Sequence, residues 1–162
     1  MEEWTRIPEF PNYSVSSSGN IRNDRFDRLM TLSVNQRGAV HVALMQGTKQ
    51  YRRSVALLVA NAYLPEPPSP AFDTPIHLDG DPFNNAAENL LWRPFWFAMK
   101  YKLQFRGPRK GFRVPIEDVS SGEQFPTSWE AATKYGLLDF EILLATQNRT
   151  YVWPTYQRFR VL

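Results

Sequence analysis

Side chains that could carry out acid–base chemistry are concentrated in one stretch, residues 76–92, which reads I-H-L-D-G-D-P-F-N-N-A-A-E-N-L-L-W. His77 is one of only two histidines in the chain, and imidazole is the side chain best suited to move protons near neutral pH. Asp79 and Asp81 flank a glycine, and asparagines follow them. Aspartate, glycine and asparagine favour tight, self-bonded turns. The stretch therefore predicts a strand that ends at His77 and an ordered loop that holds the histidine in place.

The spacing I-H-L-D-G-D-x-x-N-N-x-x-x-N-L-x-W resembles the central motif of the HNH endonucleases, in particular the homing endonucleases of phage introns. The resemblance implies a ββα-metal fold in which His77 is the general base that activates water against a DNA phosphodiester. It also implies that Asn89 braces the loop and that one divalent cation stabilises the scissile phosphate. The alternative for His77 is a structural role in a loop that has lost its chemistry.

Two positions that bind the metal in the intron nucleases are changed. An acidic residue directly before the histidine and an asparagine or histidine on the following helix are replaced by Ile76 and Ala98. Since hard cations require oxygen ligands, the resemblance predicts a degenerate metal site. Asp79 and Asp81 are the candidate replacement ligands, although both also fit the turn itself. The expected cofactor is none if the chain is inactive, and Mg²⁺ or Mn²⁺ if it is active.

A second resemblance lies near the N-terminus. Residues 4–21 follow the pattern W-x-x-I-P-x-F-x-x-Y-x-V-S-x-x-G-x-I, which is similar to the small module that precedes the HNH core in many homing endonucleases. Glu9 stands where a glycine is usual, and Asn23 where a serine is usual. Apolar and polar residues alternate through this region, and this alternation independently predicts short strands in a small antiparallel sheet.

Helices are expected after these strands. Ser54 is a candidate N-cap for an apolar helix over residues 55–63, which should be buried in the core. Residues 95–105 have helical composition and would form the α of the ββα unit, with two lysines facing outward. The residues expected on its core face are Phe95, Phe97, Met99, Leu103 and Phe105.

The C-terminal residues predict a third structural part. Thr127 and Glu130 form a capping box at a helix that Gly136 would end, a second helix is expected at residues 138–145, and residues 151–161 alternate like a closing strand. The order resembles the helix-turn-helix module appended to intron nucleases, whose second helix docks in the major groove. The exposed face of that helix would present two carboxylates to phosphates, on Asp139 and Glu141. Binding to DNA and binding to a protein both remain open for this module.

Charge is distributed unevenly along the chain. The formal net charge is +3, yet no acidic residue occurs between Asn89 and Ile116. Seven cations interleaved with aromatic residues lie there, a composition typical of segments that follow a nucleic-acid backbone. The alternative is a solvated basic linker beside a buried aromatic stripe. The candidate DNA-binding residues are Arg93, Lys100, Lys102, Arg106, Arg109, Lys110 and Arg113.

The expected fold class is α+β, with a small antiparallel sheet and an HNH ββα-metal-like core. The expected domains are an N-terminal β module (1–50), the HNH-like core (51–106), a basic linker (107–113) and a helix-turn-helix-like module (114–162). The chain has no cysteine and no apolar run of membrane-spanning length. We therefore expect a soluble protein of the cytoplasm, that of a bacterial host if a phage encodes it, without membrane contact.

The favoured function is that of an HNH homing-endonuclease-like DNA-binding protein, catalytically inactive or impaired, acting as a phage-type regulatory or interaction factor. Its expected partners are double-stranded DNA and a host or phage protein. The alternative is an active metal-dependent HNH endonuclease that nicks DNA with His77 as general base. A third reading, in which the fold serves as an assembly subunit, would involve no DNA binding.

Overall fold

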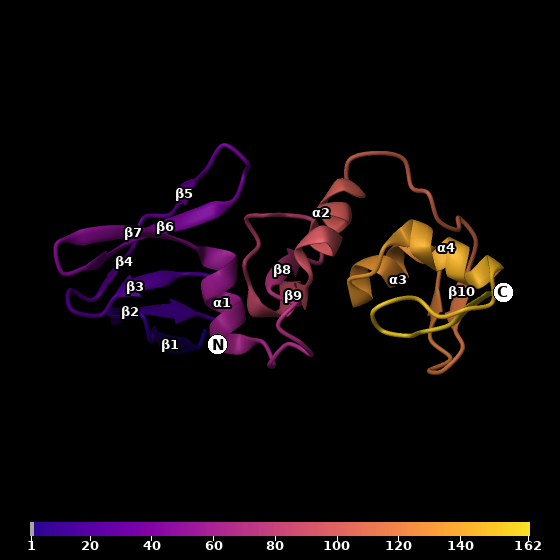
Figure 1. The fold of residues 1–162 in the computed structure, drawn as a ribbon, viewed down its shortest axis with the longest axis horizontal. Coiled ribbons are helices and arrows are strands. Elements are labelled where there is room, and N and C mark those ends of the chain that lie inside the picture. Colours follow the sequence, from indigo (N-terminus) through magenta and orange to yellow (C-terminus); the bar gives the residue numbers. More distant parts are fainter. Residues whose placement is uncertain (1) are drawn as a thin grey trace. The chain divides into compact units, whose positions relative to one another are not determined.

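The computed structural model describes residues 2–162, which pack as two compact units (Figure 1). The first unit ends at Phe95 and the second begins at Trp96. Each unit has its own core of buried apolar side chains. Within residues 2–162, no helix is long and apolar enough to cross a lipid bilayer.

The first unit contains two small antiparallel sheets. The four strands of the first sheet follow chain order, and the three strands of the second sheet do the same. They are β1 (Trp4–Ile7), β2 (Phe10–Ser16), β3 (Ile21–Asn23) and β4 (Arg28–Leu29), then β5 (Ser33–Val34), β6 (Val40–Gln46) and β7 (Lys49–Ser54). The antiparallel pairing agrees with expectation, but two sheets replace the expected single one because residues 30–32 belong to neither ladder.

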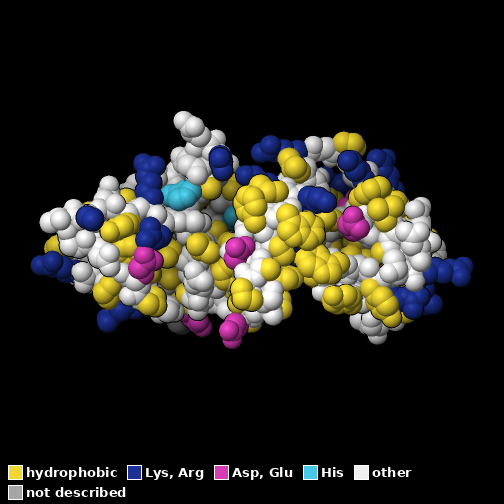
Figure 2. Space-filling view, in the orientation of Figure 1, with side chains coloured by type: hydrophobic (Ala, Val, Ile, Leu, Met, Phe, Trp, Pro, Cys, Tyr) yellow, Lys and Arg dark blue, Asp and Glu magenta, His cyan; other side chains and the backbone are white. Residues whose placement is uncertain are grey.

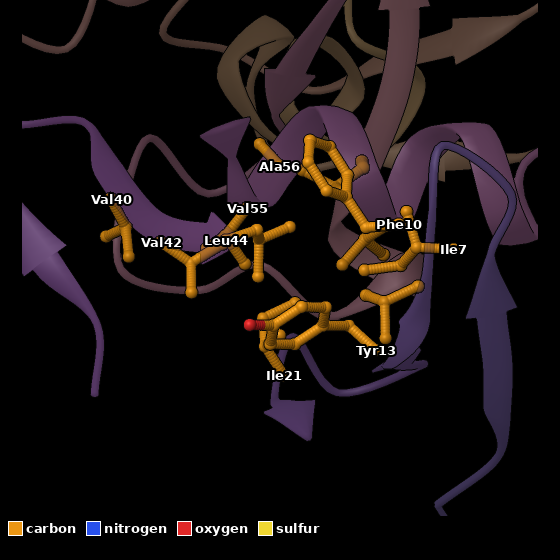
Figure 3. Packing of buried hydrophobic residues seen from close by; sticks show 12 residues of the cluster. Ile7, Phe10, Tyr13, Ile21, Val40, Val42, Leu44, Val55 and Ala56 are labelled. Atoms are coloured by element: carbon orange, nitrogen blue, oxygen red, sulfur yellow. The ribbon is translucent and has the colours of Figure 1, made fainter. Parts of the chain in front are cut away.

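Helix α1 (Val55–Tyr63) covers these sheets and has the expected bounds. Its N-cap is Ser54, whose hydroxyl oxygen accepts a hydrogen bond from the backbone N–H of Leu57 (3.3 Å). The helix buries one face, formed by Val55, Ala56, Val59 and Ala60. Figure 3 shows Val55 and Ala56 beside side chains from both sheets, including Phe10 and Leu44.

A hairpin that carries the histidine completes the first unit. Strand β8 (Thr74–His77) pairs antiparallel with β9 (Leu90–Arg93), and His77 lies opposite Leu90. The connecting loop ends in a short 3₁₀ turn, η1 (Ala87–Asn89). Leu90 is fully buried in the same core as α1 and the sheets, so the hairpin is packed into the N-terminal part of the chain.

After helix α2 (Phe95–Leu103), the second unit holds a three-stranded sheet and two further short helices. The sheet has the order β11 (Gln124–Phe125), β10 (Ile116–Asp118), β12 (Phe159–Val161). Helices α3 (Ser128–Tyr135) and α4 (Asp139–Gln147) pack against it. The expected capping box and the left-handed Gly136 are confirmed at the two ends of α3.

Two expectations about this unit are wrong in part. Helix α2 (Phe95–Leu103) buries Phe97, Ala98 and Tyr101, whereas three of the expected core residues are exposed. Residues spaced by two cannot share one helical face, because each step turns the helix by about 100°. The exposed ones are Phe95, Met99 and Leu103.

The closing strand is also shorter than the expected span 151–161. Only residues 159–161 pair in the sheet, and residues 152–157 form a turn closed by an isolated bridge between Val152 and Gln157. Pro154 within that turn has no N–H to donate to a ladder. Its neighbour Trp153 stacks on Trp96 of α2, with ring centroids 5.3 Å apart.

Candidate active site and nucleic-acid interface

His77 stands at the end of β8 and is partly exposed, while the preceding Ile76 is buried. Its Nε2 atom lies 2.7 Å from the side-chain oxygen of Asn85. The amide orientation of Asn85 follows from its Nδ2, which donates to the carbonyl of Pro82 (3.2 Å). An amide oxygen only accepts hydrogen bonds, so Nε2 of His77 carries a proton and donates it. In the neutral ring, the lone pair that could take a proton is then on Nδ1.

Asn89 braces the loop from its buried position beside β9. Its Oδ1 accepts from the backbone N–H of Asp79 (3.1 Å), and its Nδ2 donates to Asp79 Oδ1 (2.9 Å) and to the carbonyl of Asn84 (2.9 Å). These bonds tie the first residues of the loop to the last ones. Asn89 therefore holds the two ends of the loop together.

The two acids of the motif are engaged in the turn. Asp79 Oδ1 also accepts from the backbone N–H of Asp81 (2.9 Å), and Oδ2 accepts from Asn84 Nδ2 (2.8 Å). Desolvation acts to raise the pKa of Asp79, but the hydrogen bonds from Asn84, Asp81 and Asn89 outweigh it and lower that pKa below its ordinary value. Asp81 is exposed, and its Oδ1 accepts from the backbone N–H of Phe83 (2.9 Å).

The side chains near His77 do not fit a divalent cation. Ile76, directly before His77, is a buried apolar residue without an oxygen ligand, and both carboxylate oxygens of Asp79 already accept hydrogen bonds from the loop. Ala98, on α2 of the second unit, likewise offers no oxygen ligand. Between residues 2 and 162, no group of three or more His, Asp or Glu side chains is placed to hold a metal ion. This donor set differs from the one that the resemblance implies.

Six of the seven candidate DNA-binding cations are exposed and belong to the second unit. Figure 2 shows Lys and Arg side chains gathered over α2 and the loop that follows it. The seventh, Arg93, is buried, and its Nη1 donates to the carbonyl of Trp92 (2.8 Å). This hydrogen bond to a backbone carbonyl offsets part of the cost of burying the guanidinium. Arg93 is thus not placed for a surface contact with DNA, which corrects its inclusion in the basic set.

Four of the exposed cations line a cavity of about 390 Å³ in the second unit. Lys100, Arg106, Arg109 and Lys110 contribute to it, together with Trp129 and the first residues of α4. The guanidinium carbon of Arg109 lies 3.5 Å from the centroid of the Trp129 ring. This stacking holds one cation of the segment against the folded unit.

Asp139 corrects the expectation that α4 presents two acids to solvent. Its carboxylate is buried, with Oδ2 accepting from the backbone N–H of Gly111 (2.9 Å) and Oδ1 from the hydroxyl of Ser128 (2.5 Å). A side chain at residue 111 would collide with it, because an added Cβ there would lie 2.1 Å from Asp139 Oδ1. The segment 107–113 is therefore fastened to the C-terminal module, and only Glu141 is exposed as expected.

Sequence reasoning gave no role to two residues of these sites. Asn85, the hydrogen-bond partner of His77, belongs to the Asn-Asn pair of the motif. That pair is the feature of the sequence that could have pointed to it. Gln104 accepts from the backbone N–H of Asp139 (3.0 Å) and donates to the carbonyl of Leu137 (3.1 Å), so it links the end of α2 to the start of α4. No local pattern in the sequence marks a contact between residues so far apart.

Comparisons with known proteins agree with this architecture. The NUMOD4 motif, which is found in HNH endonucleases, matches residues 2–45. An uncharacterized HNH endonuclease of Acanthamoeba polyphaga mimivirus is 27% identical over 135 residues, which cover 83% of this chain and 40% of the relative. The chain therefore spans less than half the length of that relative. The solved HNH homing endonuclease I-HmuI, which binds and cleaves DNA, is 20% identical, with a TM-score of 0.57 over 99% of this chain and 98% of that one. This match shows a shared α+β fold.

Proposed function

We propose that this chain is a member of the HNH homing endonuclease family, which the NUMOD4 match, the mimivirus relative and the shared fold support, that it binds double-stranded DNA and that its cleavage activity is lost or strongly impaired. The observation that carries the DNA-binding part is the run of six exposed cations in a segment without a single carboxylate. Aromatic side chains stand between these cations, and Arg109 is already held on Trp129. A basic segment that is held on a folded unit suits contact with phosphates.

The binding part is tested by the salt dependence of affinity. Each phosphate contact releases counterions, so neutralising Lys100, Lys102 and Arg106 to glutamine should flatten the slope of log K against log salt by about one unit per lost contact. Fluorescence anisotropy with a labelled duplex at several salt concentrations measures this slope.

A matched control removes the same charge from cations that already face carboxylates. Arg53, Lys134 and Arg160 form ion pairs with Glu9, Glu123 and Glu117. The triple glutamine variant at these positions should leave the slope close to that of the unchanged chain. Equal slopes in both triple variants would refute the assignment of the basic segment, and no binding at low salt would refute DNA binding altogether.

The impaired cleavage follows from the donor set around His77. A general base alone does not stabilise the charge that develops on the scissile phosphate and the leaving oxygen. With Ile76 and Ala98 at the family's ligand positions, neither position offers a divalent cation a side-chain oxygen. We expect no nicking of supercoiled plasmid in Mg²⁺ or Mn²⁺ beyond the level of His77→Ala or of an EDTA control.

An active nicking endonuclease is the second candidate, and one observation favours it. His77 keeps an ordered ring whose Nδ1 is the basic nitrogen, as a general base requires. In that case Asp79 or Asp81 would supply the metal ligands, and Mg²⁺ or Mn²⁺ would be the cofactor. Metal-dependent nicks that disappear in His77→Ala would establish this activity and overturn the impaired reading.

The finer biological role that we propose is a regulatory or interaction factor of phage type. A scaffold that holds DNA without cutting it can block or recruit other proteins at that site. The C-terminal module is the candidate surface for a host or phage protein, since Glu141 at the start of α4 is exposed and a carboxylate there disfavours phosphate contact.

A further inference from the structure

The turn between β2 and β3 is held rigid by its own hydrogen bonds. The buried hydroxyl oxygen of Ser16 accepts from the backbone N–H groups of Ser18 (3.3 Å) and Asn20 (2.9 Å). The N–H of Gly19 donates to the carbonyl of Ser16 (3.1 Å). Gly19 has φ +92°, a conformation that glycine adopts without steric cost. The turn thus has one well-defined shape.

This turn lies directly against the loop that follows His77. A Cβ added to Gly19 would lie 3.0 Å from the Cβ of Asn85 and 3.2 Å from its carbonyl oxygen. Next to this contact, the carbonyl of Ser17 accepts from the backbone N–H of Ala87 (2.8 Å). The backbone of residues 17–19 therefore packs directly against the backbone of residues 85–87. This close approach is possible because Gly19 has no side chain.

Asn85 connects the turn that contains Gly19 to the ring of His77. It is buried, with 4% of its surface exposed, and it accepts the Nε2 proton of His77 at 2.7 Å. A Cβ at Gly19 would require Asn85 to move by a few tenths of an ångström, which would lengthen this hydrogen bond toward the upper limit of about 3.2 Å and weaken it. Without it, nothing on this side of the ring selects the Nε2–H tautomer over the Nδ1–H tautomer.

We propose that Gly19 of the N-terminal module is a positioning residue for His77: it seats Asn85, and Asn85 fixes the ring tautomer that leaves Nδ1 as the basic nitrogen. The inference rests on the proposed placement of the site at His77. It goes further in making the N-terminal module part of that site, because the module sets the protonation geometry of the histidine.

The test compares Gly19→Ala with Gly38→Ala. Gly38 has a similar φ, +82°, but an added Cβ there meets nothing within 4 Å. Both variants carry the backbone strain of alanine at positive φ, and only the first meets Asn85. Long-range ¹H–¹⁵N spectra report the tautomer of His77 through its two ring nitrogens, independently of catalysis. We expect the Gly38 variant to keep the single Nε2–H pattern and the Gly19 variant to lose it.

The route through Asn85 is tested by a double-variant cycle. Asn85→Ala should give the same mixed tautomer pattern, and adding Gly19→Ala to it should change the His77 nitrogens no further. If Gly19→Ala does not fold, the pair Gly19→Asn and Gly38→Asn repeats the comparison with a residue that tolerates positive φ better.

A folded Gly19 variant with an unchanged His77 spectrum would overturn the inference. A further change on the Asn85→Ala background would also overturn it, since another route would then exist. DNA affinity and its salt slope should stay unaltered in the Gly19 variant, because the basic segment is untouched. Loss of DNA binding in the unchanged chain would instead count against the proposed function, and the His77 spectrum would remain a separate result.

Discussion

At the scale of single residues, the acids of this chain serve folding more than chemistry. Asp79 accepts three hydrogen bonds within its own loop, and Asp139 accepts two that fasten the basic segment. Asp118 follows the same pattern on β10, where it accepts from Ser120 and Gln157. A carboxylate engaged in this way braces its turn and has fewer lone pairs left for a cation.

The pKa of Asp118 leads to a prediction about acid stability. Burial acts to raise this pKa, but the hydrogen bonds from Gln157 Nε2 (3.0 Å) and the Ser120 N–H (2.9 Å) outweigh it and lower the pKa below its ordinary value. Its contribution to stability is fully present above the unfolded-state pKa of about 3.9 and is lost as pH falls through the lower folded-state pKa. Thermal unfolding midpoints should therefore drop as pH falls below about 4.

The variant Asp118→Asn isolates this group. It should be less stable at neutral pH, and its unfolding midpoint should fall less steeply below about pH 4 than that of the unchanged chain. The remaining slope belongs to groups such as Asp24 and Asp79, whose pKa values are also lowered. Identical slopes in the two proteins would show that Asp118 does not contribute.

At the scale of elements, the contact between Gly111 and α4 offers a second prediction. A Cβ at Gly111 would lie 2.1 Å from both Asp139 Oδ1 and Ser128 Oγ, whereas one at Gly107 meets nothing within 4 Å. Overpacking a filled site typically costs about 1–3 kcal/mol. Gly111→Ala should lower the free energy of unfolding of the second unit by an amount in this range, and Gly107→Ala should change it little. Urea denaturation measures both, and equal effects would contradict the fastening role of residue 111.

Elements whose ends are set by local chemistry were predictable from the sequence. The bounds of α1 follow from the Ser54 cap and the apolar run behind it, and the bounds of α3 follow from its capping box and Gly136. The face that α2 buries was not predictable in the same way. It depends on Trp153, more than fifty residues away, which packs against Phe97 with ring centroids 5.6 Å apart.

In the site too, features set by nearby residues were predictable from the sequence and features set by distant residues were not. The motif placed His77 on a strand end and Asn89 as a brace, because both roles depend on neighbours within a dozen residues. The burial of Arg93 and Asp139 could not be read from charge patterning. The donors to Asp139 are supplied by the tertiary fold, whereas Arg93 donates to the carbonyl of its neighbour Trp92. Charge patterns therefore located the basic segment but overstated which of its charges reach solvent.

At the scale of the whole molecule, the single core of the first unit ties the histidine hairpin to the N-terminal sheets. Leu90, opposite His77, is buried with Phe10 and Val42 in that core. Opening the hairpin would expose Leu90 to water and leave a void between the sheets and α1. Opening of this hairpin therefore carries the cost of disrupting the core of the first unit, so we expect it to be rarer than the opening of an exposed loop.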